Sequence, residues 1–173
     1  WNEEGKLQGW LDSSLTEKGK NQIIKLKEHL QLIEFEAVYS SPSKRASETA
    51  SRSNLNSNVE VLHVDINSEK MIDVFEEFPP DFVIHLAAQT SVSTSVEFPK
   101  KDAETNILGT IHLLELCKEF SAKKVIYTSS AAVYGENDVL PLLENYPLAP
   151  TSPYGLSKLV GENYIKLFSK LYC

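Results

Sequence analysis

The clearest fold signal in this sequence is a pair of short apolar runs that each end in small polar residues. The runs read "FVIHLAA" over 82–88 and "KVIYTSS" over 124–130. Such runs are typical of strands buried in a parallel sheet, and ligands of open α/β folds bind at the carboxyl ends of these strands. Segments of helical periodicity separate and follow the runs, and this alternation is typical of a parallel sheet covered on both faces. We therefore predict a three-layer α/β fold with a mainly parallel sheet and helices on both faces.

The predicted elements alternate along most of the 173 residues. Thr16 can cap the first helix, and Ser152 before Pro153 fixes the start of the last one, because proline is well tolerated at the first helical position. The predicted helices cover residues 16–33, 43–52, 68–77, 100–120 and 152–171, and the predicted strands cover residues 37–39, 59–64, 82–86 and 124–128.

Composition and charge limit the classes of partner. The chain has 42% apolar and 24% charged residues, as ordinary globular proteins do, and a net charge of -7. An acidic chain argues against a nucleic-acid partner, and no apolar run approaches the roughly 20 residues that span a bilayer. The first residues lack the features of a signal peptide, so we expect a cytoplasmic protein without a membrane partner. Cys117 lies among leucines and is expected to be an apolar filler, and we expect no metal site.

The last predicted helix carries a candidate proton-transfer group. Tyr154 and Lys158 are four residues apart, so both side chains leave the same face of that helix. A phenol is a poor base at neutral pH, but a nearby ammonium group favours the phenolate. A hydroxyl that holds the substrate is then expected at the end of a neighbouring strand, where Ser129 and Ser130 lie. Taken alone, a tyrosine and a lysine at this spacing are common on amphipathic helices.

The order of several motifs is more specific than the pair alone. In chain order they read "VIHLAAQTSVSTSV", "NILGT", "YTSSAAVYG" and "ENYPLAPTSPYGLSK". Together they resemble the extended short-chain dehydrogenase/reductase family, in its NAD-dependent nucleotide-sugar epimerase/dehydratase group of the UDP-glucose 4-epimerase kind. The resemblance covers residues 59–173 and implies a Rossmann-like fold, NAD as cofactor, a nucleotide sugar as small-molecule substrate, and a possible homo-oligomer.

The resemblance also implies roles for individual residues. Tyr154 matches the catalytic base, Lys158 matches the residue that binds the nicotinamide ribose and favours the phenolate, and Ser130 matches the hydroxyl that positions the substrate. The remaining residues match positions near the cofactor, namely Asp65 and Ile66 at the adenine edge, Ala87, Ala88 and Gln89 along a strand end, and Asn106 near the active site. His85 is expected to be a packed residue of its strand.

Two departures from the family pattern bear on activity. Sugar 4,6-dehydratases of this kind carry an acidic pair after the hydroxyl residue, whereas this chain has Ala131 and Ala132, which favours epimerisation or simple oxidation over dehydration. The Gly-rich turn G-x-x-G-x-x-G, which binds the cofactor pyrophosphate, is absent from the sequence.

The first fifty residues give a different indication. "WNEEGKLQGWLDSSLTEKG" followed by "YSSPSKRASETA" resembles the histidine phosphatase superfamily of phosphoglycerate mutase-like proteins. The resemblance implies that Asn2 and Arg45 match phosphate-binding positions, and a guanidinium grips phosphate through two oxygens. The nucleophilic histidine of the "RHG" motif is absent from the sequence. The segment is therefore expected to be a partial one without its catalytic machinery.

These two resemblances predict a join. The predicted organisation is a phosphatase-like segment at 1–50, a polar seam at 51–58 and an epimerase-like segment at 59–173, which could pack as one α/β domain. Three interpretations stay open: an NAD-dependent epimerase-like fragment with a Ser/Tyr/Lys site, a phosphatase-like or mutase-like protein, and an inert fusion or chimera.

Overall fold

The computed structural model describes residues 14–30, 48–49 and 62–172, and the chain divides into two compact units, Trp1–Val64 and Asp65–Cys173. The predicted seam at 51–58 and the predicted strand at 37–39 lie outside the described residues. Of the predicted helix at 43–52, only Glu48 and Thr49 are described, and both are helical.

The described part of the first unit is mainly the helix α1, Glu17–Leu30. The hydroxyl of Thr16 accepts a hydrogen bond from the backbone N–H of Gly19 at 3.1 Å, so Thr16 caps this helix as predicted. Ile23 is buried, which agrees with its place on the apolar face. The backbone N–H of Leu15 donates to a carboxylate oxygen of Glu48 at 3.3 Å, which links the start of α1 to the second described piece.

The second unit contains a parallel pair of strands, β1 (Phe82–His85) and β2 (Lys124–Tyr127), and both confirm the sequence prediction. They pair in register, with Phe82 opposite Lys124 and His85 opposite Tyr127. The predicted strand at 59–64 is wrong for residues 62–64, which have no strand structure. Alternating apolar residues indicate that one face of a segment is buried. A strand forms only where a neighbouring strand also completes its backbone hydrogen bonds, and the alternation does not predict that neighbour.

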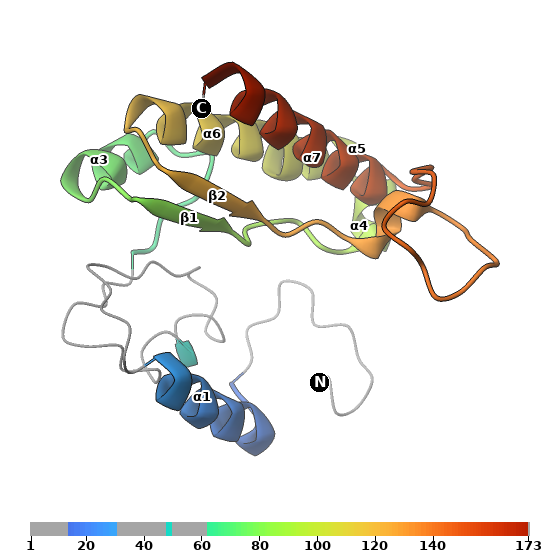
Figure 1. Ribbon diagram of the computed structural model, residues 1–173, viewed down its shortest axis with the longest axis horizontal. Helices are drawn as coiled ribbons and strands as arrows, with labels where there is room; N and C mark the ends of the chain where they lie inside the picture. The colour runs from blue at the N-terminus through green and yellow to red at the C-terminus, as the bar shows by residue number, and fades with distance from the viewer. Residues whose placement is uncertain (1–13, 31–47, 50–61, 173) are drawn as a thin grey trace. The chain divides into compact units, whose positions relative to one another are not determined.

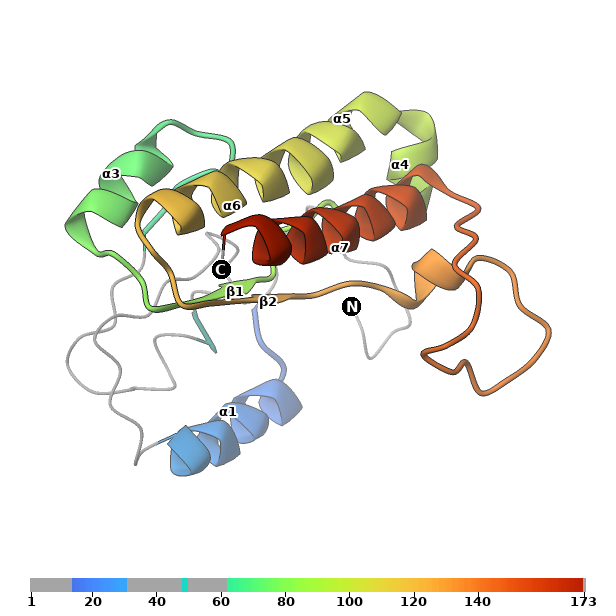
Figure 2. The ribbon, with the colours of Figure 1, turned by 45° about the horizontal axis from the view of Figure 1, so that its top comes forward.

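Helices cover one face of this sheet. The helices α3 (Lys70–Glu77), α6 (Gly109–Glu119) and α7 (Pro153–Tyr172) lie on the same side of β1 and β2, as Figures 1 and 2 show. The core between these layers contains Phe75 from α3 and Leu113, Leu116 and Cys117 from α6, with Val83 and Val125 of the strands packed against it. The α/β class and the parallel sheet are thus as predicted.

The opposite face of the sheet carries apolar side chains that are exposed. Phe82 and Ile84 of β1 are 65% and 63% exposed, and Ile126 of β2 is 49% exposed. Within residues 65–172, helices pack on the face that carries Val83 and Val125 and on no other face of the sheet. This part of the molecule therefore has two of the three predicted layers, one of helices and one of strands.

One long predicted helix, at 100–120, is built from three consecutive segments. These are α5 (Pro99–Ala103), a π-helical turn η2 (Glu104–Leu108) and α6. A π-helical turn inside an α-helix is rare and is frequent at functional sites. Here it includes Asn106, whose side chain is buried.

Two short helices were not predicted. The helix α4 (Val92–Glu97) is capped by the Ser91 hydroxyl, which accepts from the N–H of Thr94 at 3.2 Å. The 3₁₀-helix η3 (Ala131–Tyr134) follows β2 directly.

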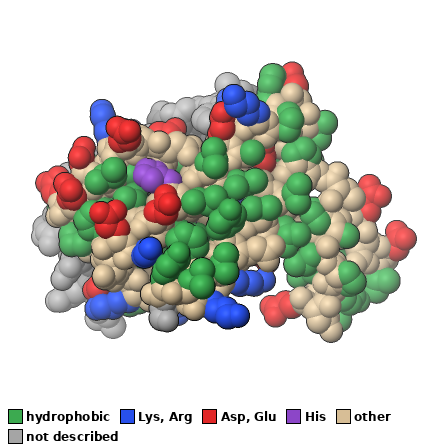
Figure 3. Space-filling view, turned by 90° about the horizontal axis from the view of Figure 1, so that it is seen from above, with side chains coloured by type: hydrophobic (Ala, Val, Ile, Leu, Met, Phe, Trp, Pro, Cys, Tyr) green, Lys and Arg blue, Asp and Glu red, His purple; other side chains and the backbone are tan. Residues whose placement is uncertain are grey.

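Figure 3 shows the helical layer from outside, where apolar side chains gather among the charged ones. Exposed leucines on this layer include Leu108, Leu156, Leu167 and Leu171. Within the described segments, each helix is too short or too polar to span a membrane.

Candidate active site

The predicted tyrosine–lysine pair lies in the first two turns of α7. The hydroxyl of Ser152 accepts from the N–H of Gly155 at 3.1 Å, and Pro153 is the first helical residue, as the sequence predicted. Tyr154 and Lys158 are both buried, with 8% and 4% of their surface exposed. The backbone N–H of Tyr154 donates to the fully buried hydroxyl of Ser95 at 3.1 Å, which ties the start of α7 to α4.

The ammonium group of Lys158 reaches the carboxyl end of β2. Its Nζ donates to the carbonyl oxygen of Thr128 at 2.8 Å and lies 4.9 Å from the centre of the Tyr127 ring. Burial lowers the pKa of Lys158, and the negative charge of Asp102 opposes that effect. The fold therefore places the amino group of this lysine at the sheet edge where ligands of open α/β folds bind.

The two serines after β2 have different partners. The hydroxyl of Ser129 donates to a carboxylate oxygen of Glu162 on α7 at 2.6 Å. The Ser130 hydroxyl accepts from the N–H of Ala132 at 3.2 Å and so caps η3. Among the described residues the Ser130 hydroxyl donates to no acceptor, so its proton can be donated to a bound oxygen. Ser130 therefore fits the substrate-positioning role better than Ser129 does.

Tyr127 is a neighbour of this group that the sequence reasoning missed. Its hydroxyl donates weakly to the carbonyl oxygen of Lys158 at 3.5 Å. Burial, together with the nearby Tyr154 and Glu162, raises the pKa of Tyr127 to about 12, so this phenol is neutral at physiological pH. The two-residue period of "KVIYTSS" places Val125 and Tyr127 on one face, and this signal could have found it.

Gly161 makes room for Tyr127 one turn beyond Lys158. A β-carbon at position 161 would lie 2.7 Å from Cζ of the Tyr127 ring, which is closer than non-bonded atoms approach. The close approach of α7 to β2 at this site therefore requires glycine.

His85 is a packed residue, as predicted. It is 3% exposed, and its Nε2 lies 2.9 Å from the hydroxyl oxygen of Thr110. That hydroxyl donates its own proton to the carbonyl oxygen of Asn106, so the His85 ring donates from Nε2. Burial, and secondly the charge of Lys158, lowers the pKa of His85 to about 4. The ring is neutral at pH 7.

Asn106 and Gln89 belong to a buried polar network beside the pair. The Asn106 side chain accepts from the N–H of Gln89 at 2.8 Å and donates to the Gln89 carbonyl at 2.9 Å. It also donates to the hydroxyl of Ser157 on α7 at 3.1 Å. Gln89 uses its own side chain inside this network, whereas Ala87 is exposed and Ala88 is half-buried. Of the strand-end residues predicted to lie along a cofactor, the two alanines are therefore the accessible ones.

The predicted adenine-edge residues have local roles in this structure. Asp65 is exposed and accepts the N–H of Asn67 at 2.8 Å through one carboxylate oxygen. Ile66 packs against the core of the second unit, and its carbonyl oxygen is 2.8 Å from Nδ1 of His112. Asn2 and Arg45, predicted as phosphate-binding positions, lie outside the described residues.

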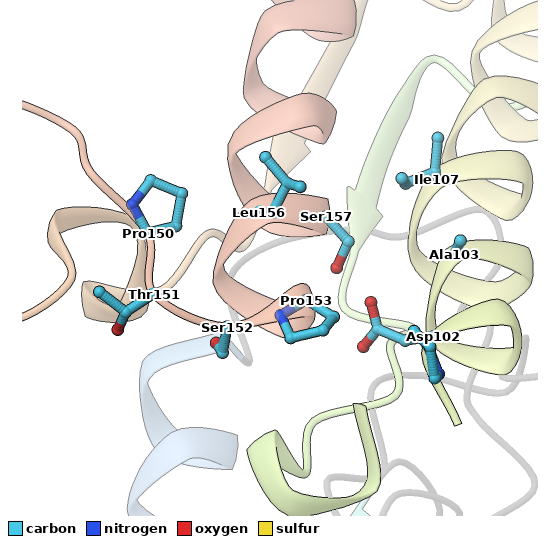
Figure 4. A pocket seen from close by; sticks show the side chains of 10 residues that line it. Asp102, Ala103, Ile107, Pro150, Thr151, Ser152, Pro153, Leu156 and Ser157 are labelled. Carbon is cyan, nitrogen blue, oxygen red and sulfur yellow. The ribbon is translucent and has the colours of Figure 1, made fainter. Parts of the chain in front are cut away.

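An open hollow of about 490 Å³ lies on the helical layer between α5, η2 and the start of α7 (Figure 4). Its lining is mostly proline and aliphatic, with Asp102, Ser157 and two hydroxyl residues as polar groups. Tyr154, Lys158 and Ser130 are not among its lining residues. The hollow therefore lies beside the tyrosine–lysine group and does not enclose it. Within the described ranges, no three His, Cys, Asp or Glu side chains are grouped as metal ligands.

The parallel strands, the crossover helices and the tyrosine–lysine pair at the sheet edge define a Rossmann-like α/β protein. The sequence profile of the family described as GDP-mannose 4,6 dehydratase matches residues 22–173, and the chain belongs to this family.

Several proteins similar to this chain carry the name UDP-glucose 4-epimerase. The chain is 44% identical over 125 residues to a putative UDP-glucose 4-epimerase of Methanocaldococcus jannaschii, covering 72% of this chain and 41% of the relative. Among solved structures, the UDP-glucose 4-epimerase of Thermotoga maritima with UDP-glucose is 36% identical, with a TM-score of 0.71, over 89% of this chain and 48% of that one. The UDP-glucose 4-epimerase of Brucella ovis in complex with NAD is 32% identical, with a TM-score of 0.64, over 70% of this chain and 37% of that one. The chain thus spans less than half the length of these relatives.

The phosphatase resemblance of the first fifty residues finds no support in these comparisons. The family match begins at residue 22 and includes 22–50, which the sequence analysis assigned to the phosphatase-like segment. The boundary between the two compact units falls after Val64, beyond the predicted seam.

Proposed function

We propose that this chain carries the catalytic residues of an NAD-dependent nucleotide-sugar 4-epimerase of the UDP-glucose 4-epimerase type. The observation that supports this most directly is the buried pair of Tyr154 and Lys158, with the lysine ammonium bound to the carbonyl oxygen of Thr128 at the end of β2. The names of the relatives, which are UDP-sugar 4-epimerases, agree with the proposal.

In this proposal, Tyr154, Lys158 and Ser130 together transfer the proton of a sugar hydroxyl and hold the sugar oxygen in place. Tyr154 as phenolate accepts the proton of a sugar hydroxyl, and the positive charge of Lys158 favours that phenolate. Ser130 donates its free hydroxyl proton to the same sugar oxygen and so holds it against Tyr154. Bound NAD would supply the hydride acceptor, which these proton-moving side chains cannot replace.

The described residues fit the nicotinamide end of NAD. The ammonium group of Lys158 reaches the carboxyl end of β2, and the accessible Ala87 follows the carboxyl end of β1, where a nicotinamide ribose would bind. The pyrophosphate end needs a glycine-rich turn before a helix, and the sequence contains none. We therefore expect weaker NAD binding than in a protein with that turn.

Ala131 and Ala132 support epimerisation over dehydration. They form the start of η3 directly after Ser130. Elimination of water needs an acid and a base beside the sugar, and methyl groups at these two positions provide neither.

The proposal is tested by titrating the purified chain with NAD⁺ and NADH while recording nicotinamide fluorescence and the melting temperature. A ligand that binds the native state alone raises its stability, so we expect the melting temperature to rise with NADH concentration. Turnover is then measured as conversion of UDP-glucose to UDP-galactose with added NAD⁺. A cooperative melt that neither nucleotide shifts would contradict the proposal and favour an inert protein.

A further inference from the structure

Asp102, on α5, is a buried carboxylate next to the tyrosine–lysine group. It is 1% exposed, and a buried charge is costly unless hydrogen bonds and an opposite charge compensate it. Its Oδ1 accepts from Nε2 of Gln89 and from Nδ2 of Asn106, both at 3.0 Å. Figure 4 shows the carboxylate directed from α5 toward Ser157 on α7.

These bonds connect Asp102 to the start of α7. The carboxylate can accept hydrogen bonds but cannot donate them, so it favours the same orientation of the Asn106 amide as the backbone N–H and carbonyl of Gln89 do. With Nδ2 toward Asp102, the same nitrogen lies 3.1 Å from the hydroxyl oxygen of Ser157, so its two protons are shared among Asp102, Ser157 and the Gln89 carbonyl. Ser157 in turn donates to the carbonyl oxygen of Tyr154 at 2.9 Å, and it directly precedes Lys158.

The negative charge of Asp102 also acts on Lys158, whose ammonium group is itself bonded to the carbonyl oxygen of Thr128. The titratable groups that interact in this part of the site, besides Lys158, are His85 on β1, Tyr127 on β2, Asp102 on α5, and Tyr154 and Glu162 on α7. His85 and Tyr127 are neutral at pH 7, because burial lowers the pKa of the first to about 4 and raises that of the second to about 12. The carboxylate of Glu162 is bonded by Ser129 and Lys166.

We propose that Asp102 is a positioning residue of this site, whose carboxylate orients the Asn106 amide that holds the first turns of α7 and balances the buried charge of Lys158. The effect of Asp102 on catalysis rests on the proposed function. In support, the charge of Asp102 raises the pKa of Lys158 against the effect of burial. A lysine that stays charged can in turn favour the Tyr154 phenolate.

The test is an NMR titration of the full chain with ¹³C-labelled lysine side chains, in wild type, Asp102→Asn and Asp73→Asn. The Lys158 signal is assigned by its loss in Lys158→Met. Asp73→Asn removes the same charge from an exposed position on α3 and is the matched control. We expect the Lys158 titration to move to lower pH in Asp102→Asn and to coincide with wild type in Asp73→Asn.

An unchanged Lys158 titration in a folded Asp102→Asn chain would overturn the proposal. If that variant does not fold, Asp102→Leu, of similar shape, is measured instead. Failure of both to fold, while Asp73→Asn folds, would assign Asp102 to the stability of the fold and would also overturn it. The titration needs no cofactor or turnover, so its result is separate from the NAD-binding experiment that tests the proposed function.

Discussion

The imidazole of His85 couples folding to pH. Its pKa is lowered to about 4 in the folded chain, first by burial and then by the charge of Lys158, whereas an unfolded histidine titrates near 6.5. Between these values the unfolded chain binds a proton that the folded chain does not bind. The free energy of unfolding therefore decreases as the pH falls from about 6.5 to about 4, by about 3 kcal/mol in total from this group.

We expect His85→Phe to reduce this acid sensitivity, because phenylalanine keeps a ring in the core and does not titrate. The measurement is urea unfolding of wild type and variant at pH 7 and pH 4.5. His29→Gln, at an exposed position of α1, is the control and should keep the wild-type difference between the two pH values. An equal pH dependence in His85→Phe and wild type would contradict this assignment.

The phenol of Tyr154 is the group that the proposed chemistry cannot lose. Tyr154→Phe removes the hydroxyl and keeps the ring, so we expect kcat for epimerisation to fall by about 10² or more, as for loss of a general base, while NADH binding persists. Tyr164→Phe, on the same helix, is the control. The Tyr164 ring packs against Phe168, and Tyr164 follows Lys158 by nearly two helical turns. Equal turnover in Tyr154→Phe and wild type would remove Tyr154 from the mechanism.

At the level of elements, the approach of α7 to η3 depends on Gly155. A β-carbon there would lie 2.5 Å from the carbonyl oxygen of Ala132 and 3.1 Å from Cβ of Pro150. A backbone carbonyl cannot rotate away as a side chain can, so we expect Gly155→Ala to lower the free energy of unfolding by about 1–3 kcal/mol, as overpacking does.

Gly19→Ala in α1 is the control that separates the steric effect of a β-carbon at position 155 from the general effect of alanine on helix stability. The nearest atoms to a β-carbon there are 3.5 Å away, which is ordinary contact. Alanine is favoured over glycine within helices by about 1 kcal/mol, so this control should be neutral or stabilising. Both variants are compared by thermal and urea unfolding, and a stabilised Gly155→Ala would show that α7 and η3 separate easily.

The elements that the sequence predicted well are those with local signals. The strands β1 and β2 are short apolar runs with clear ends, and Ser152 with Pro153 marks the start of α7 by cap chemistry alone. The helix α4 was missed because "VSTSVE" has no apolar period, and its cap is a hydrogen bond from Thr94 to Ser91.

The candidate site could be predicted in part. The spacing of Tyr154 and Lys158 places them on one face of a helix, and the structure has them there, while their catalytic roles stay predictions. Asp102 could not be found in this way. It follows two lysines in "PKKDAETN", a context typical of a solvated helix, and its burial arises from the packing of α5 against α7 and the loop that carries Gln89.

At the level of the whole molecule, the two faces of the β1–β2 sheet are expected to differ in their sensitivity to polar substitution. Val83 packs against the core, whereas the neighbouring Ile84 is 63% exposed. We expect Val83→Thr to cost about 1–3 kcal/mol of unfolding free energy, because it buries a hydroxyl, and Ile84→Thr to stay within about 0.5 kcal/mol of wild type. The pair is compared by urea unfolding. An equal loss in both variants would mean that the outer face is covered in solution.

The parallel pairing of β1 and β2 has a kinetic consequence. Phe82 pairs with Lys124, so about forty residues, including the whole of α4, α5, η2 and α6, must be arranged before the ladder can close. Closing a loop of that length costs little additional free energy but delays the search for the native contacts. We therefore expect refolding of the second unit to be slower than for a helical bundle of equal size, with its speed set by how early the crossover helices form.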